Sequence, residues 1–309
     1  MRERERVLDP AGDDAIVING LARRYRSLSA LLFGCGGTDK VAVRGISVGI
    51  KKNECFGLLG VNGAGKTTTF KMLTGDETVT AGTAVLNGHD IRTAMQQVRR
   101  QIGYCPQFDA LIELMTGREL LVMYARLRGI PAANVDDEVT RLINLLALEK
   151  HADKLSWTYS GGNKRKLSTA IALVGRPPIV FLDEPTTGVR HLRILWSISR
   201  VFVRSPPLHL RRVLCSTYSV HPYRVHGDWC LEFDVVANSG LQVDPGARRF
   251  LWDALLEVLE DGAVIVLTSH SMEECEALCT RLTIVRAPSF SSLGFPYRRA
   301  ATLNVHAQC

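Results

Sequence analysis

The sequence of 309 residues contains no long apolar run. A membrane-spanning helix needs about 20 consecutive apolar residues, whereas the most apolar stretches here, such as residues 263–268, have the length of single strands. The charged residues 1–6 are not followed by the apolar segment of a secretory signal. Because 46% of the residues are hydrophobic, the chain can bury a core of its own, and we expect any role at a membrane to depend on a partner.

The eight cysteines include no pair separated by two residues, which is the spacing of many zinc sites and redox motifs. Cys275 and Cys279 lie four positions apart and could share a metal ion, but no second pair has a zinc-site spacing. Idle or buried thiols are therefore the favoured interpretation, and they suit a reducing cytosol.

The net charge of +7 is confined to two segments. Residues 189–242 hold seven arginines and three acids, and residues 285–309 hold three arginines and no acid, so the two segments carry +4 and +3. The remainder is neutral, with 28 basic and 28 acidic residues. Because these two segments also break the pattern of the rest of the chain, we do not expect a nucleic-acid partner.

Apolar runs of strand length alternate with helical patterns along the chain. Strands are expected at residues 16–18, 45–50, 55–59, 179–182 and 264–267. Helices are expected at residues 67–73, from a capping box at 116–119 to a stop at 129–131, at residues 135–148, and from residue 160 onward. The alternation predicts an α/β fold with a parallel or mixed sheet, into which an all-helical subdomain is inserted at about residues 108–165.

The sequence GVNGAGKT at residues 60–67 matches the phosphate-binding pattern GxxxxGK[ST] of P-loop NTPases at every fixed position. Glycines let backbone N–H groups curl around phosphates, and the following helix adds its positive end. We expect Lys66 to bridge the phosphates of ATP and Thr67 to bind Mg²⁺, whereas a plain glycine-rich turn is the alternative. The residues expected to bind the nucleotide here are Gly60, Asn62, Gly63, Ala64, Gly65, Lys66, Thr67 and Thr68.

Two acids end the apolar strand at residues 179–182. Asp183 can hold Mg²⁺ through its water shell, and Glu184 can polarise an attacking water. Many buried strands end in acids, so this feature alone is weak. Together with the phosphate-binding loop it indicates an ATPase.

The sequence Tyr159-Ser160-Gly161-Gly162-Asn163 resembles the signature motif of the ATP-binding cassette (ABC) family, usually written LSGGQ, with Asn163 in place of glutamine. A serine N-cap followed by glycines exposes free N–H groups to an anion, although a plain helix cap is the alternative. In the family, the serine and its glycines contact the γ-phosphate bound by the opposite domain. The resemblance therefore implies that Ser160, Gly161 and Gly162 complete the site of a second cassette in a head-to-tail pair.

Four other residues occupy the places of further family elements. Gln107 matches the Q-loop glutamine, which in the family senses Mg²⁺ and the γ-phosphate and faces the transmembrane partner. His270 matches the switch histidine, and a structural role is its alternative. Tyr25 resembles the aromatic residue that stacks on adenine, although a long loop separates it from Gly60, and Asp244 resembles the D-loop aspartate.

The sequences of residues 55–66, 159–168 and 268–279 resemble those of the lipid-exporting A subfamily, in particular of its second nucleotide-binding domain. The likeness covers about residues 16–188 and 243–284, with residues 1–15 as the remnant of a linker. It implies an ATPase held at the cytoplasmic face of a membrane by transmembrane domains that are absent from this chain, so that ATP hydrolysis drives the movement of a lipid.

Two other interpretations stay open. The chain could be a catalytically impaired ATP-binding fragment with a regulatory role or none. A soluble cassette of the translation or chromosome type is disfavoured, because the residues around Gln107 and Ser160 match the transporter branch.

Residues 189–242 interrupt the family pattern, and deleting these 54 residues rejoins it. Every valine codon begins with GT and a glutamine codon can be CAG, so Val189 and Gln242 could mark the ends of a retained intron. A genuine regulatory loop or basic arm is the alternative. Residues 285–309 form a second atypical segment, without the expected strand-and-turn continuation. Because the insertion would hinder the approach of two cassettes, we expect the chain as written to bind ATP but to hydrolyse it poorly.

Overall fold

The structure is a computed structural model that describes residues 14–25, 39–188, 219–225, 228–234, 241–242, 245–285 and 305–308. The chain divides into two compact units: residues 1–187 with 243–309, and residues 188–242. Asp244, the expected D-loop residue, lies outside the described residues.

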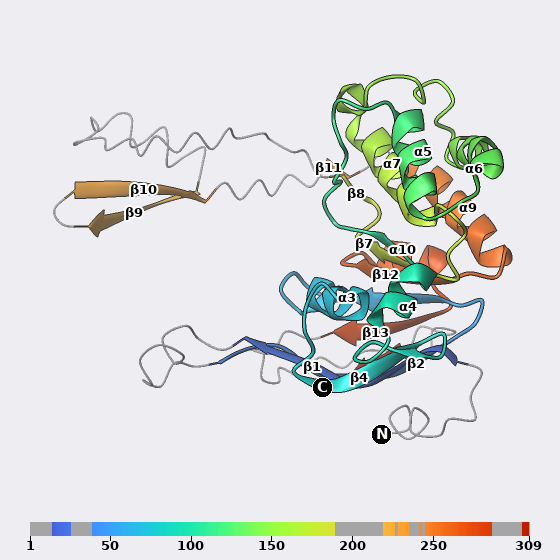
Figure 1. Ribbon diagram of the computed structural model, residues 1–309. Helices are drawn as coiled ribbons and strands as arrows, with labels where there is room; N and C mark the ends of the chain where they lie inside the picture. The colour runs from blue at the N-terminus through green and yellow to red at the C-terminus, as the bar shows by residue number, and fades with distance from the viewer. Residues whose placement is uncertain are drawn as a thin grey trace. The chain divides into compact units, whose positions relative to one another are not determined.

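A parallel sheet forms the centre of the first unit (Figure 1). Its strands, in spatial order, are β14 (Val305–Gln308), β13 (Arg281–Val285), β3 (Cys55–Leu59), β12 (Val264–Ser269), β7 (Ile179–Asp183) and β6 (Ile102–Cys105). All neighbouring pairs run in the same direction. The continuous apolar runs at 55–59, 179–182 and 264–267 therefore form three adjacent strands, as expected for strands covered on both faces.

Successive side chains of these strands enter different cores. On β7, Ile179 and Phe181 pack into one hydrophobic cluster, whereas Val180 and Leu182 pack into another. The same alternation holds on β12. Because strand side chains alternate between the two faces, two separate cores sandwich the sheet.

An antiparallel sheet covers one face of the parallel sheet, with two helices at its side (Figure 1). The strands are β2 (Lys40–Lys51), β1 (Asp14–Tyr25), β4 (Ala81–Leu86) and β5 (His89–Asp90), in that order, and the helices are α3 (Lys66–Thr74) and α4 (Met95–Gln101). Strands β1 and β2 extend well beyond the expected residues 16–18 and 45–50.

The hairpin between β4 and β5 was not expected, although its signal is present in the sequence. Asn87 and Gly88 form its two-residue turn, with φ angles of 45° and 81°. Asn-Gly is the preferred pair for such a turn, because both central residues need positive φ.

Helices lie on the other side of the parallel sheet: α5 (Gly117–Leu127), α6 (Ala132–Leu145), α7 (Gly161–Leu173), α9 (Pro245–Glu260) and α10 (Met272–Leu278), with a short 3₁₀ turn η1 (Ser156–Thr158). Helices α7 and α10 pack on the strands, and α5 and α6 pack on α7. The expected capping box is confirmed, because Thr116 accepts a hydrogen bond from the Glu119 N–H and the Glu119 carboxylate accepts one from the Thr116 N–H. Ser160 caps α7, as expected. Helix α6 begins three residues earlier than expected, directly after Pro131, which occupies its N-cap position.

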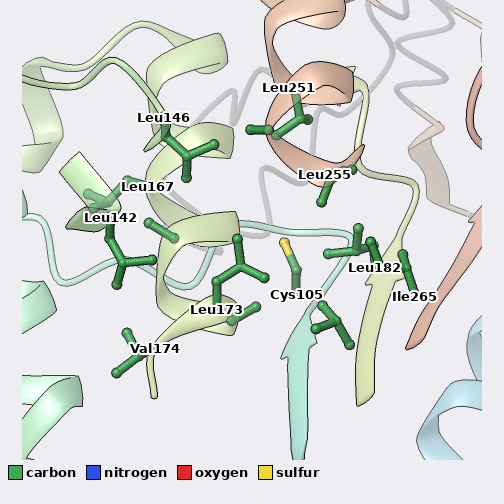
Figure 2. Close-up of a cluster of buried hydrophobic side chains, with 14 of the residues drawn as sticks. Cys105, Leu142, Leu146, Leu167, Leu173, Val174, Leu182, Leu251, Leu255 and Ile265 are labelled. Atoms are coloured by element: carbon green, nitrogen blue, oxygen red, sulfur yellow. The ribbon is translucent and has the colours of Figure 1, made fainter. Parts of the chain in front are cut away.

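Figure 2 shows how the second core joins helices from distant parts of the sequence to the sheet. Leu251 and Leu255 come from α9, beyond the 54-residue segment, and they belong to the same cluster as residues from α6, α7 and the strands. These partners include Cys105, Leu142, Leu146, Leu167, Leu173, Leu182 and Ile265. The chain after residue 242 therefore returns to the core of the first unit.

The second unit contains an antiparallel hairpin of β9 (Ser219–Val225) and β10 (Asp228–Asp234). This hairpin was not expected, although Trp229, Leu231 and Phe233 alternate with polar residues or cysteine, which is a strand signal. Two short strands, β8 (Thr187–Gly188) and β11 (Leu241–Gln242), lie at the two ends of residues 188–242.

Strand β14, at the edge of the parallel sheet in the first unit, was also not expected. In the part of the chain that the structure describes, no helix is both long and apolar enough to cross a membrane.

The packing of α9 predicts unequal effects of two neighbouring substitutions. Leu255 is 1% exposed and Leu256 is 39% exposed. Leu255→Ala should lower the free energy of unfolding by about 2–5 kcal/mol, because it leaves a cavity in the core, whereas Leu256→Ala should cost less than about 1 kcal/mol. Urea unfolding of both variants checks this. Equal costs would show that α9 does not pack as described.

Candidate functional site

The predicted phosphate-binding loop connects β3 to α3. Gly63 and Gly65 have φ angles of 79° and 100°, a region that residues with a Cβ rarely adopt. A Cβ on Gly65 would also lie 2.6 Å from the carbonyl oxygen of Ala42. The loop curls around its own lysine, because Lys66 Nζ donates to the carbonyl of Gly60 over 2.7 Å. Lys66 is thereby placed at the inner side of the loop, with its side chain buried.

A cavity of about 810 Å³ opens over this loop. It brings together Tyr25, the loop residues from Asn62 to Thr68, Gln107 and Glu184. Lys40 and Arg44 also line it, although neither was expected from the sequence. The cavity therefore has the size and the positive groups that suit a small phosphorylated ligand. The guanidinium carbon of Arg23 lies over the Tyr25 ring, 4.7 Å from its centre.

Three predicted residues meet at the carboxylate of Glu184. Gln107 Nε2 donates to Glu184 Oε2 over 2.9 Å. Lys66 Nζ lies 3.6 Å from Glu184 Oε1, and His270 Nδ1 lies 3.7 Å from the same oxygen. Residues that are far apart in the sequence therefore surround one carboxylate that is almost fully buried.

The backbone of Glu184 is held in an uncommon conformation. Its φ angle is 49°, in the left-handed region that costs a residue with a Cβ about 1–2 kcal/mol. Its N–H donates to the Thr268 carbonyl over 3.2 Å and lies 3.0 Å from the Thr268 hydroxyl oxygen. Because β12 lies directly beside β7, Thr268 can support this turn.

Asp183 is fully buried at the carboxyl end of β7. One carboxylate oxygen, Oδ1, accepts a hydrogen bond from the Thr268 hydroxyl. The other, Oδ2, is buried and has no hydrogen-bond partner among the residues that the structure describes. A buried carboxylate oxygen without a partner is costly, and carboxylate oxygens are preferred ligands of Mg²⁺ and its waters, so the residues present fit the expected ion.

The signature residues do not line this cavity. Ser160 accepts a hydrogen bond from the Asn163 N–H at the start of α7, over 3.3 Å. Ser160 and Gly161 are exposed, and among the described residues no atom from outside the helix start lies within 4 Å of the position that a Cβ on Gly161 would take. Gly162, which is half-buried, follows them. The three residues form an open helix start rather than part of the pocket around Lys66.

Three supporting residues were missed in the sequence. Thr268 could have been found, because it follows the apolar run 264–267 directly, and in the structure it pairs with Asp183 on the adjacent strand. Glu274 accepts a hydrogen bond from the Ser269 hydroxyl over 2.6 Å, and burial raises the pKa of its carboxyl group. Arg165 lies in a run of basic residues that reads as a solvated helix face, and nothing in its sequence context shows that it is buried.

Comparisons with known proteins identify this architecture. The sequence model described as "ABC transporter" matches residues 43–187. The chain is 46% identical over 298 residues to "Phospholipid-transporting ATPase ABCA3" of Rattus norvegicus, covering 95% of this chain and 14% of that protein. The chain belongs to the ABC transporter family. Its similarity to "ATP-binding cassette sub-family A member 7" of Rattus norvegicus, 43% over 295 residues, supports the A subfamily, as expected.

This chain is much shorter than the relatives it matches. It is also 44% identical over 293 residues to "Retinal-specific phospholipid-transporting ATPase ABCA4" of Bos taurus, covering 94% of this chain but 10% of that protein. For sub-family A member 7 the corresponding shares are 95% and 11%. The chain thus spans between 10% and 14% of the lengths of these relatives.

Solved structures confirm the expected ABC fold. An ATP-binding subunit of an ABC transporter superimposes with a TM-score of 0.61 at 21% identity, covering 88% of this chain and 87% of that chain. A dimeric bacterial ABC transporter cassette superimposes with a TM-score of 0.63 at 17% identity, covering 88% and 94%. Both likenesses concern the fold alone.

Proposed function

We propose that this chain is a nucleotide-binding domain of an A-subfamily ABC transporter, which binds ATP with Mg²⁺ and hydrolyses it. The meeting of Lys66, Gln107 and His270 at the carboxylate of Glu184 is the observation that carries the proposal. Such an arrangement is needed when one carboxylate must orient a water beside a bound phosphate.

The phosphates are bound by the loop after β3. Lys66 supplies a positive charge at the inner side of the loop, and backbone N–H groups of the loop supply neutral donors. The N–H groups of Gly60 and Ala64 are not among these donors, because they donate to the carbonyls of Ser269 and Val61. The ring of Tyr25 stacks on the adenine in the same cavity, which fits its place in the cavity lining.

Thr67, Asp183 and Gln107 would hold the ion. Asp183 suits this role because its Oδ2 is buried and has no hydrogen-bond partner in the part of the chain that the structure describes. When bound, Mg²⁺ neutralises charge on the phosphate oxygens. The proposal requires the hydroxyl of Thr67 to face the same ion from the start of α3.

Glu184 orients the attacking water and accepts a hydrogen bond from it. Gln107 holds one oxygen of this carboxylate, and His270 lies beside the other. His270 is half-exposed, so its ring can turn toward the terminal phosphate of a bound nucleotide. The three side chains thus place and polarise one water molecule.

The partner of this domain is a second cassette in a head-to-tail pair. The exposed helix start at Ser160, Gly161 and Gly162 offers free N–H groups to the terminal phosphate held by the partner. Asp244 lies at the seam between the two cassettes in this proposal. One solved structure of the same fold is described as a dimeric cassette, which supports such a pair.

Transmembrane domains outside this chain hold the pair at the cytoplasmic face of a membrane and use its hydrolysis to move a lipid. The support comes from the names of two relatives, which describe phospholipid-transporting ATPases, and from the small share of their length that this chain spans. In this proposal the chain corresponds to the second nucleotide-binding domain, with residues 1–15 as a linker remnant.

Residues 189–242 are an insertion, encoded by a retained intron, that splits the cassette into residues 16–188 and 243–284. Their separation as a second compact unit at residues 188–242 supports an insertion. Residues 285–309 form the atypical tail. Sequencing of the transcript from Gly188 to Asp244 tests the intron: molecules that mostly read through the segment would favour a genuine regulatory arm instead.

Substitution of Lys66 tests nucleotide binding. Lys66→Ala should weaken ATP affinity by about 10- to 100-fold, because it removes a charged hydrogen bond to the phosphates. Lys71→Ala is the matched control, since Lys71 is an exposed lysine on the same helix, and it should change affinity by less than about threefold. Fluorescence titration gives both affinities. Unchanged binding by folded Lys66→Ala protein contradicts the proposed function.

Deletion of residues 189–242 tests the alternative of a catalytically impaired fragment. A longer surface loop costs only about 0.6 kcal/mol per doubling of its length, so the full chain should fold and bind ATP. The insertion hinders the close approach of two cassettes, however, so deletion should raise ATP turnover at least about tenfold at unchanged affinity. Equal turnover by the two proteins, measured as phosphate release, is the result that this account forbids.

A further inference from the structure

Arg165 is a buried cation inside α7, five residues after the helix cap Ser160. Its side chain is 1% exposed. Because burial makes an unpaired charge very costly, its N–H groups need acceptors within the protein. These acceptors are the backbone carbonyls of Pro106, Gln107, Asp183, Glu184 and Pro185, and the carboxylate of Asp109.

One side of the guanidinium binds the segment that follows β6. Arg165 Nη1 donates to the carbonyl of Pro106, to the Asp109 carboxylate over 3.1 Å and, more weakly, to the carbonyl of Gln107 over 3.5 Å. This segment carries the Gln107 side chain that reaches Glu184. Arg165 therefore fixes the backbone from which Gln107 extends.

The other side binds the segment that follows β7. Nε donates to the carbonyl of Pro185 over 3.0 Å, and Nη2 donates to the carbonyls of Asp183 and Glu184, the latter over 3.1 Å. Glu184 is the residue with the left-handed backbone conformation. A strained conformation persists only when its surroundings hold it, and here the carbonyls on both sides of Glu184 and its own carbonyl all accept from Arg165.

The charge of Arg165 is retained in this setting. Burial by itself lowers the pKa of a guanidinium, but the neighbouring Cys105, Asp109 and Asp183 outweigh it, so the pKa of Arg165 lies above its usual value. A planar guanidinium can donate in several fixed directions at once, which a lysine ammonium cannot reproduce.

We propose that Arg165 is a positioning residue that clamps the segments after β6 and β7 together, so that Gln107, Asp183 and Glu184 face one Mg²⁺-bound nucleotide. This inference rests on the proposed function. The described contacts of Arg165 include none with residues 60–68, so its direct contacts lie on the metal and water side of the site.

The test compares ATP affinity of the full-length chain in excess Mg²⁺ with its affinity in EDTA, for wild type, Arg165→Gln and Arg165→Lys. The ratio of the two affinities measures the Mg²⁺-linked part of binding. Loss of a residue that orients metal ligands typically costs about 10- to 100-fold in metal affinity. We expect the ratio to fall by at least about tenfold in both variants, with the affinity in EDTA changed by less than about threefold.

Two controls separate positioning from stability. Leu142→Ala removes a fully buried side chain from α6 and should destabilise the fold without contacting the carbonyls that Arg165 binds. Arg128→Gln removes another guanidinium that donates to a backbone carbonyl, that of Ile102 over 2.7 Å. Both controls should keep the wild-type ratio, and urea unfolding shows that every variant is folded under the binding conditions.

Each outcome decides the inference. The positioning role is overturned if Arg165→Gln keeps the wild-type ratio of affinities. It is also overturned if Leu142→Ala, at a similar loss of stability, lowers this ratio as much as Arg165→Gln does. In both cases the proposed function stands. An equal loss of affinity in Mg²⁺ and in EDTA shows that Arg165 supports the phosphate loop instead. If the wild type binds no ATP in either condition, the proposed function fails and the inference with it.

Discussion

The parallel order of the central strands is the constraint on which the site depends. Because β3, β6, β7 and β12 run in the same direction, the segments that follow them emerge at one edge of the sheet. The phosphate-binding loop, Gln107, Glu184 and His270 are brought together in this way, although more than 200 residues separate the first from the last. An antiparallel partner strand would have sent its following segment to the opposite edge.

The buried carboxylates of Asp183 and Glu184 at that edge need further residues to hold them in place. Thr268 donates to Asp183 and supports the N–H of Glu184, whereas Arg165 binds the carbonyls around the same two acids. One carboxylate oxygen of Asp183 stays without a partner among the described residues. The protein thus holds its acids by their backbone and leaves one oxygen free for a ligand, which is an arrangement suited to binding an ion rather than to stability alone.

The sequence predicted the parts of this fold in which local and global preferences agree. Continuous apolar runs indicated β3, β7 and β12, and cap residues located the starts of α5 and α7. Prediction from the sequence failed where a tertiary contact decides whether a residue is buried. Arg165 is buried because its guanidinium binds carbonyls of two other segments. The β4–β5 hairpin was also not predicted, but its local signal, the Asn-Gly pair of the turn, is present in the sequence. The roles of all the site residues, those of the signature motif and Asp244 included, stay predictions.

The central claim is that residues from separate segments hold one Mg²⁺-bound nucleotide, and a double-mutant cycle tests it most directly. Thr67→Ala and Asp183→Asn, alone and together, should each weaken Mg²⁺-dependent ATP binding. If both residues hold the same ion, their effects should be coupled by at least about 1 kcal/mol, because the second substitution has little left to remove. Fully additive effects in calorimetric titrations would show that the two residues act at different places, which contradicts the account.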